Sequence, residues 1–166
     1  MDFIFDIVSV RTFWRILLFI HFTLAVSLLA AVTLQAVAVL MPVRQPAGNF
    51  MDRVRAVSAV SYAPVIVALY VPQFIMGMWV YIKYRTYVRI PMEQTGHWSI
   101  VAAFDGKEHV AAIGMALLPA YWYFWQPSAA PQHLRVRAML TALLAFTVWW
   151  SFLVGHIVNN VRGFGS

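Results

Sequence analysis

Four long apolar runs constrain this chain more than any other feature of its sequence. About 20 consecutive apolar residues are enough to cross the hydrocarbon core of a bilayer as a helix. The predicted runs cover residues 14–40, 57–82, 108–125 and 136–158, and they lack the period-two alternation of membrane strands. Hydrophobic residues make up 62% of the sequence and charged residues only 11%. We therefore predict an all-α, polytopic membrane protein, with residues 1–166 forming a single four-helix transmembrane bundle.

The stretches that separate the runs carry turn-forming and polar residues. We predict that residues 43–56 form a polar loop, because they contain Pro46, Gly48 and three arginines. Residues 90–109 are expected to form an interfacial loop or a short amphipathic helix. Its apolar side chains Trp98, Ile100, Val101 and Phe104 would lie at the membrane surface. Pro64 and Pro72 predict a kinked second helix that bends near Pro72.

Charge placement indicates membrane topology and not nucleic-acid binding. The net charge is +6, but the lysines and arginines stand mainly at the ends of the apolar runs, where they anchor to headgroups. With four spans and the termini inside, seven cations lie inside and five outside. We therefore expect an integral protein of a bacterial inner membrane with both termini cytoplasmic and with no cleaved signal peptide. Its expected partners are the lipid bilayer and further membrane or redox subunits.

Cysteine content limits the chemistry that the chain can perform. The sequence has no cysteine, which excludes disulfides, iron–sulfur clusters, thiolate zinc sites and covalent c-type haem attachment. Any metal or haem must be held by histidine, methionine or carboxylate. No Ser-His-Asp grouping, HExxH motif or glycine-rich phosphate loop can be read, so a hydrolase or a nucleotide-dependent enzyme has no support.

Three histidines are predicted to lie at a similar depth on the same side of the bundle. His21 is early in the first run, His109 opens the third and His156 closes the fourth. Polar rings in hydrocarbon are costly and normally face the bundle interior and bind something. The alternatives are interface histidines within reach of headgroups, ligands of a haem, or another metal or quinone site. His97 and His133 are expected to be polar surface residues.

The neighbours of these histidines suit a flat cofactor. His109 shares a helical face with Ala112, Ala116 and Ala120, and small residues let another backbone or a planar ring come close. Trp149, Phe152 and His156 would form an aromatic wall. Cations for haem propionates are available at Arg15, Lys83, Lys107 and Arg162. We predict His109 and His156 as the axial pair, because consecutive antiparallel helices are neighbours. His21 would then lie behind the ligands or contact a quinone.

In helix count and histidine placement the chain resembles the small four-helix membrane cytochromes b and the CopD-like membrane proteins. It departs from the two-haem members because the second run has no histidine and none lies deep on the opposite side. The leading hypothesis is therefore an electron-transfer subunit with one b-type haem near the cytoplasmic face, exchanging electrons with quinone or a partner protein.

Two other functions are open at this point. One is a cofactor-free membrane anchor or accessory subunit of a larger complex, favoured by the many aromatic residues and the lack of a large soluble portion. The other is a copper-handling membrane protein, because Met76 and Met78 are placed near the histidines and thioether and imidazole ligands suit Cu(I).

Overall fold

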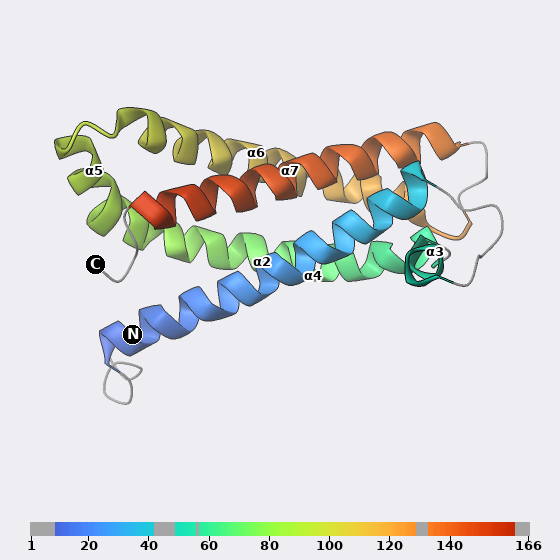
Figure 1. Ribbon diagram of the computed structural model, residues 1–166, viewed down its shortest axis with the longest axis horizontal. Coiled ribbons are helices and arrows are strands. Elements are labelled where there is room, and N and C mark those ends of the chain that lie inside the picture. The colour runs from blue at the N-terminus through green and yellow to red at the C-terminus, as the bar shows by residue number, and fades with distance from the viewer. Residues whose placement is uncertain (1–8, 42–48, 56, 129–132, 162–166) are drawn as a thin grey trace.

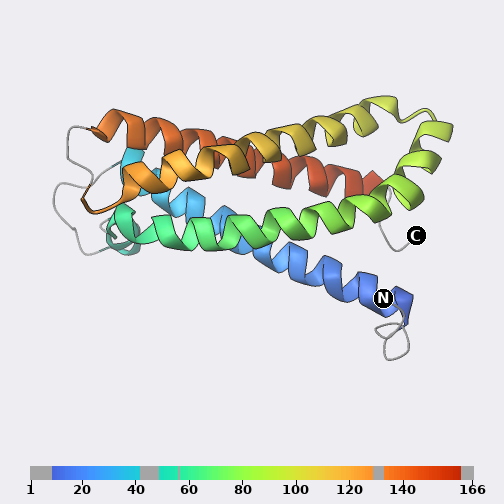
Figure 2. The same cartoon turned by 180° about the vertical axis from the view of Figure 1, so that it is seen from behind.

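Four long helices carry most of the chain in the computed structural model, which describes residues 9–41, 49–55, 57–128 and 133–161. They are α2 (Val10–Leu40), α4 (Ala59–Lys83), α6 (Trp98–Trp125) and α7 (Leu134–Val161). Shorter elements are α3 (Phe50–Arg55), the π-helical segment η1 (Tyr84–Arg89) and α5 (Ile90–Gln94). Helix α2 packs on α4 and α7, and α6 packs on the same two helices. The four therefore form a closed bundle with α2 and α6 on opposite corners (Figures 1 and 2).

Membrane-crossing potential is clear for three of the described helices. Helix α2, the continuous stretch Ala59–Gln94 and α7 are long and apolar enough to cross a bilayer, which is consistent with an integral membrane protein. Helix α6 has 28 residues but is not among them. Asp105, Lys107 and Glu108 near its start lower its mean hydropathy. The all-helical class is thus confirmed for the described residues, whereas a fourth crossing by α6 stays a prediction.

The prediction for residues 90–109 is correct for a short helix, α5, but wrong for a connection that continues to residue 109. The segment is helical except for a turn at Thr95–His97, where Gly96 adopts a φ of 79° that favours glycine. Helix α6 begins at Trp98, ten residues before the predicted start. Val101 and Phe104, expected at the membrane surface, are instead buried in a core at the end of the bundle where α2 begins. That core also contains Tyr84, Val88, Met92, Val154 and Val158.

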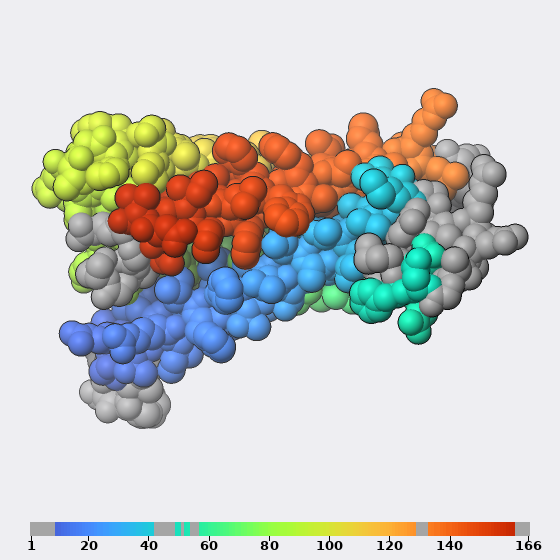
Figure 3. Space-filling model, in the orientation of Figure 1, coloured from blue at the N-terminus to red at the C-terminus, as the bar shows by residue number. Residues whose placement is uncertain are grey.

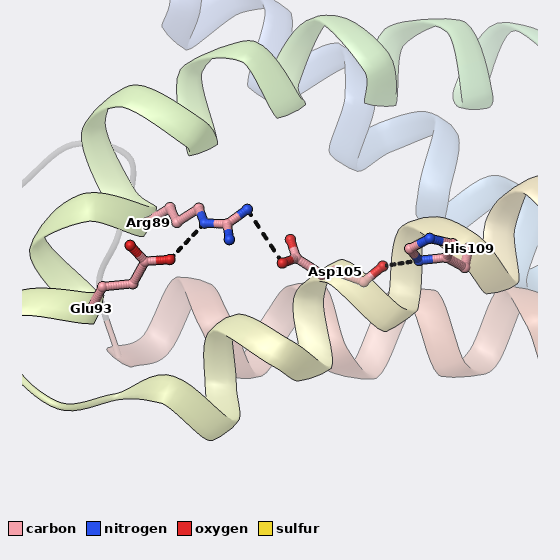
Figure 4. Close-up of polar contacts among 4 residues, drawn as sticks. All are labelled: Arg89, Glu93, Asp105 and His109. Carbon is pink, nitrogen blue, oxygen red and sulfur yellow. Dashed lines mark hydrogen bonds and ion pairs between the residues drawn. The ribbon is translucent and has the colours of Figure 1, made fainter.

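Arg89 links α5 to α6 through ion pairs outside this core. Its Nε donates to Glu93 Oε1 at 2.7 Å, and its Nη1 lies 3.3 Å from Asp105 Oδ2 (Figure 4). The charged side chains that favoured a loop for residues 90–109 are therefore paired: Glu93 and Asp105 with Arg89, and Lys107 with Glu108. Val101 and Phe104 of the same segment pack inward, whereas Trp98 is 61% exposed, as predicted.

The second predicted run forms a longer helix than its composition indicated. Helix α4 is unbroken through both Pro64 and Pro72. The bend predicted near Pro72 therefore involves no break in the helix. The departure from α-helical hydrogen bonding comes later, in the π-helical η1, and the chain changes direction toward α5 there (Figure 1). The predicted polar loop of residues 43–56 contains α3, and residues 42–48 and 56 lie outside the described residues.

A larger core fills the other half of the bundle and contains a buried amide. Gln35 of α2 is 1% exposed. Its Nε2 donates to the carbonyl oxygen of Ala59 at 3.0 Å, and its Oε1 accepts from the Tyr121 hydroxyl at 2.6 Å. Both ends of the amide are thus satisfied, as a buried polar group requires. Gln35 thereby links α2 to the start of α4 and to α6.

Candidate functional site

A cavity of about 530 Å³ lies between the four long helices. It occupies the end of the bundle at which α2 begins and α7 ends. In that region α2 diverges from α7, and the space-filling view shows the two helices separated there (Figures 1 and 3). Phe19 and Phe22 of α2 line the cavity although their exposed fractions are 71% and 54%. The cavity is therefore open at its side, between α2 and α7.

His21 enters the cavity from α2 and has no firm hydrogen-bond partner among the described residues. Its Nε2 lies 3.4 Å from Gln73 Nε2 of α4, a long contact, and its Nδ1 is buried and unpaired in the described part of the chain. Gln73 Oε1 and Ser151 Oγ, which belong to two other lining residues, are likewise buried without a partner there. Unpaired buried polar atoms are costly, so a ligand with polar atoms would be favoured here.

His156 lines the same cavity from α7. It is exposed, and its ring lies parallel to that of Phe152, with 6.5 Å between the centroids and 1° between the planes. Phe152 also lines the cavity. The predicted aromatic wall is therefore present on α7 for these two residues. His21 and His156 thus reach one space from two helices that are far apart in the sequence.

Trp149, the third member of the predicted wall, does not line the cavity. It is 41% exposed, and its Nε1 donates to Thr33 Oγ1 of α2 at 3.0 Å. The hydrogen bond joins α7 to the second half of α2, beyond the region where the two helices diverge. The Thr33 hydroxyl thus supplies the acceptor that the indole N–H needs.

Two of the predicted cations stand at the cavity and two do not. Arg15 and Lys107 line it. The Lys107 side chain is 14% exposed, its Nζ lies 2.6 Å from Glu108 Oε1, and it stands 4.1 Å from the centroid of the Phe104 ring. Lys83 instead lies over the Trp14 ring at 5.9 Å. Arg162 lies outside the described residues.

The expectation that the His109 face points into the bundle is wrong. His109, Ala112, Ala116 and Ala120 are all exposed, and the His109 ring donates outside the cavity, from Nδ1 to the Asp105 carbonyl oxygen at 2.7 Å (Figure 4). The bulky residues of α6 take the interior instead: Phe104, Leu118, Tyr121 and Trp125 are buried. The small residue that permits a close approach is Gly114, which lies on this inner face. Size alone therefore does not identify the buried side of the helix.

Gly114 of α6 lies against side chains of both α4 and α7, Tyr70 and Thr147. The Tyr70 hydroxyl donates to the Ala111 carbonyl oxygen at 3.0 Å, and both residues line the cavity. A methyl group on Gly114 would overlap the Tyr70 hydroxyl and lie 2.8 Å from Thr147 Oγ1. The glycine therefore lets Tyr70 of α4 reach across to α6.

Sequence reasoning missed Gln73, Ser151 and Tyr70 as cavity residues. A signal existed for Gln73, because an amide in the middle of an apolar run normally faces the bundle interior. The methionines considered for copper do not line the cavity, and Met78 is exposed. Within the described ranges, no three His, Cys, Asp or Glu side chains cluster in a way that could hold a metal ion. A haem differs in that it needs only one or two axial ligands from the protein.

Comparison with protein-family models, with curated proteins and with solved structures finds no match to this chain.

Proposed function

We propose that the chain is an integral membrane electron-transfer subunit whose cavity holds one b-type haem between His21 of α2 and His156 of α7. The observation that carries the proposal is that these two histidines line the same cavity, whereas His97, His109 and His133 do not. When bound, a b-type haem supplies one-electron oxidation and reduction of its iron. Quinone or a partner protein would exchange the electron. The axial pair differs from our sequence-based pair, because His109 stands on the outer face.

The lining of the cavity suits a planar macrocycle. Two imidazoles on separate helices are what a bundle needs to clamp such a ring. His21 is half-buried, and its ring nitrogens have only the 3.4 Å contact to Gln73 in the described chain, so ligation would remove an unfavourable burial. Leu18, Phe22 and Phe152 give the walls an apolar character and would keep water from the ring faces.

The cations at the cavity support an anionic edge of the ligand. Arg15 on α2 and Lys107 on α6 both line it, and such residues form charge-assisted hydrogen bonds to carboxylates. Glu108 holds Lys107 at 2.6 Å and fixes where its ammonium group stands. In this proposal Arg15 and Lys107 receive the propionates, and the apolar groups deeper in the cavity receive the ring.

The proposal includes the orientation in the membrane. Four crossings, with α6 as the third, would place the start of α2 and the end of α7 on the cytoplasmic side of a bacterial inner membrane. The excess of lysine and arginine at that end supports this orientation. The cavity lies toward the same end, so the haem would be near the cytoplasmic face.

An absorption spectrum of the detergent-purified protein, produced with sufficient haem, tests the proposal. We expect a Soret band and sharp reduced α and β bands in the intact protein. His21→Ala and His156→Ala should each lose the low-spin spectrum, because an axial nitrogen is removed. His109→Ala is the matched control, and its spectrum should not change, because that ring lies outside the cavity.

Two results would contradict the proposal. A low-spin spectrum unchanged in both His21→Ala and His156→Ala would place any haem elsewhere. An intact protein free of haem absorption that co-purifies with other membrane subunits would support the cofactor-free anchor instead.

A further inference from the structure

The first half of α2 is the longest stretch of the four long helices that contains no buried residue. The buried residues of α2 are Leu28, Ala31, Val32 and Gln35, and no residue from 10 to 27 is buried. By contrast, α7 has buried residues from Leu140 to Val158. The second half of α2 is held by apolar packing, by Gln35 and by the Thr33–Trp149 hydrogen bond. Segments with few buried contacts are those that open locally at the lowest free energy.

Two hydroxyl side chains mark the boundary between the two halves. Thr23 Oγ1 donates to the Phe19 carbonyl oxygen at 2.9 Å, and Ser27 Oγ donates to the Thr23 carbonyl oxygen at 2.9 Å. Such bonds to the carbonyl four residues earlier compete with the backbone ladder and often bend helices. They lie just before Leu28, the first buried residue of α2. Thr33 Oγ1 makes the same kind of bond to the Leu29 carbonyl oxygen at 2.6 Å, but there the helix is held by buried neighbours. Thr23 and Ser27 lack such neighbours on the side toward the start of α2, which favours bending at these two residues.

The unpacked half carries one side of the cavity. Seven residues of α2 line it, and five of them precede Thr23: Arg15, Leu18, Phe19, His21 and Phe22. The other two, Ala25 and Leu28, follow it. Across the opening, α7 presents Phe152, His156 and Asn159. The side opening between the helices faces the direction from which a membrane-dissolved, flat apolar molecule would arrive.

We propose that residues 10–22 form a hinged arm that turns about Thr23 and Ser27, admits the ligand sideways from the bilayer and closes it against α7. The inference rests on the proposed function for the identity of the ligand, a flat and largely apolar molecule with an anionic edge. Closure would bring Arg15 and His21 into contact with the ligand at the same time, because both residues belong to the arm. It would also cover Phe19 and Phe22, which are exposed at the open side of the cavity.

Distances between spin labels in lipid nanodiscs test the arm. The chain has no cysteine of its own, so labels go only where cysteines are introduced. The arm pair is Ile16→Cys with Ile157→Cys, both exposed and outside the cavity lining. The control pair is Ala30→Cys with Leu143→Cys, exposed positions on the halves of α2 and α7 that pack together.

Without haem we expect a broad distance distribution for the arm pair and a narrow one for the control pair. Adding haem should shift the distance distribution of the arm pair to shorter distances and narrow it. The distribution of the control pair should not change. Thr23→Ala with Ser27→Ala should narrow the ligand-free distribution, because the competing hydroxyls are removed from the helix.

The outcomes separate the arm from the proposed function. If the distance distribution of the arm pair without ligand is as narrow as that of the control pair, the proposal of a mobile arm is wrong, whether or not haem binds. If the distance distribution of the arm pair is broad and stays unchanged when the absorption spectrum shows bound haem, the proposed closure is wrong. If the distance distribution of the arm pair is broad in a protein that takes up no haem, the mobile arm is supported and only the haem proposal is wrong.

Discussion

Among the glycines of the described residues, Gly114 has the least room for a substitution. A methyl group there would stand 2.9 Å from Tyr70 Cζ and 2.8 Å from Thr147 Oγ1. We expect Gly114→Ala to destabilise the bundle by about 1–3 kcal/mol, the usual cost of overpacking a core. Gly106→Ala on the same helix is the control, because nothing lies within 4 Å of its added methyl group. Unfolding of the purified protein by denaturing detergent measures both, and equal midpoints for the two variants would contradict the expectation.

At this scale the sequence located the right kinds of residue but not which way they face. His21 and His156 could be identified as candidates, because a histidine in an apolar run is rare and costly. The sequence could not predict which face of α6 is buried. Gly114 lies on one face and Ala112 and Ala116 on another, and small residues on either face would permit close helix contact. The partner surface decides between them. Tyr70 needs the space at Gly114, whereas the alanines face away from the bundle.

Helix α2 is attached to the other helices mainly through its second half, and Gln35 is the polar part of that attachment. Gln35→Leu keeps most of the volume but leaves the Tyr121 hydroxyl and the Ala59 carbonyl oxygen without this partner. We expect a loss of about 1–3 kcal/mol in the free energy of unfolding. Adding Tyr121→Phe removes the stranded hydroxyl, so the double variant should cost less than the sum of the two single variants. Strictly additive costs in detergent unfolding would show that the two groups do not interact.

The elements themselves were largely predictable from apolar run length. The predicted run at 14–40 starts a few residues after α2 and ends with it at Leu40, and the run at 136–158 is a few residues shorter than α7 at each end. The start of α6 was missed because Asp105, Lys107 and Glu108 lower the hydropathy of a segment that is nevertheless helical. Their pairing with Arg89 and with each other satisfies the charges, while Val101 and Phe104 pack inward. Hydropathy measures composition and does not register such pairing.

The arrangement of the ends determines how the whole molecule would sit in a membrane. Helix α2 begins and α7 ends at one end of the bundle, and the turn between α5 and α6 lies at that same end (Figures 1 and 2). The α6–α7 connection lies at the opposite end. If the bundle crosses the bilayer as four spans, Gln94 and Ser128 must therefore face opposite sides of the membrane.

This geometry gives a direct test of the crossing by α6, the long helix that composition leaves undecided. Gln94→Cys and Ser128→Cys place single thiols at exposed positions on either side of α6 in a chain without cysteine. With both termini cytoplasmic, an impermeant maleimide added outside intact cells should label Ser128→Cys and should reach Gln94→Cys only after the membrane is permeabilised. Labelling of both positions in intact cells would mean that α6 does not cross, because its two ends would then share one side. Labelling of Gln94→Cys alone would keep the four spans but reverse their orientation. The cavity would then lie toward the outer face, and the proposed haem would exchange electrons on that side.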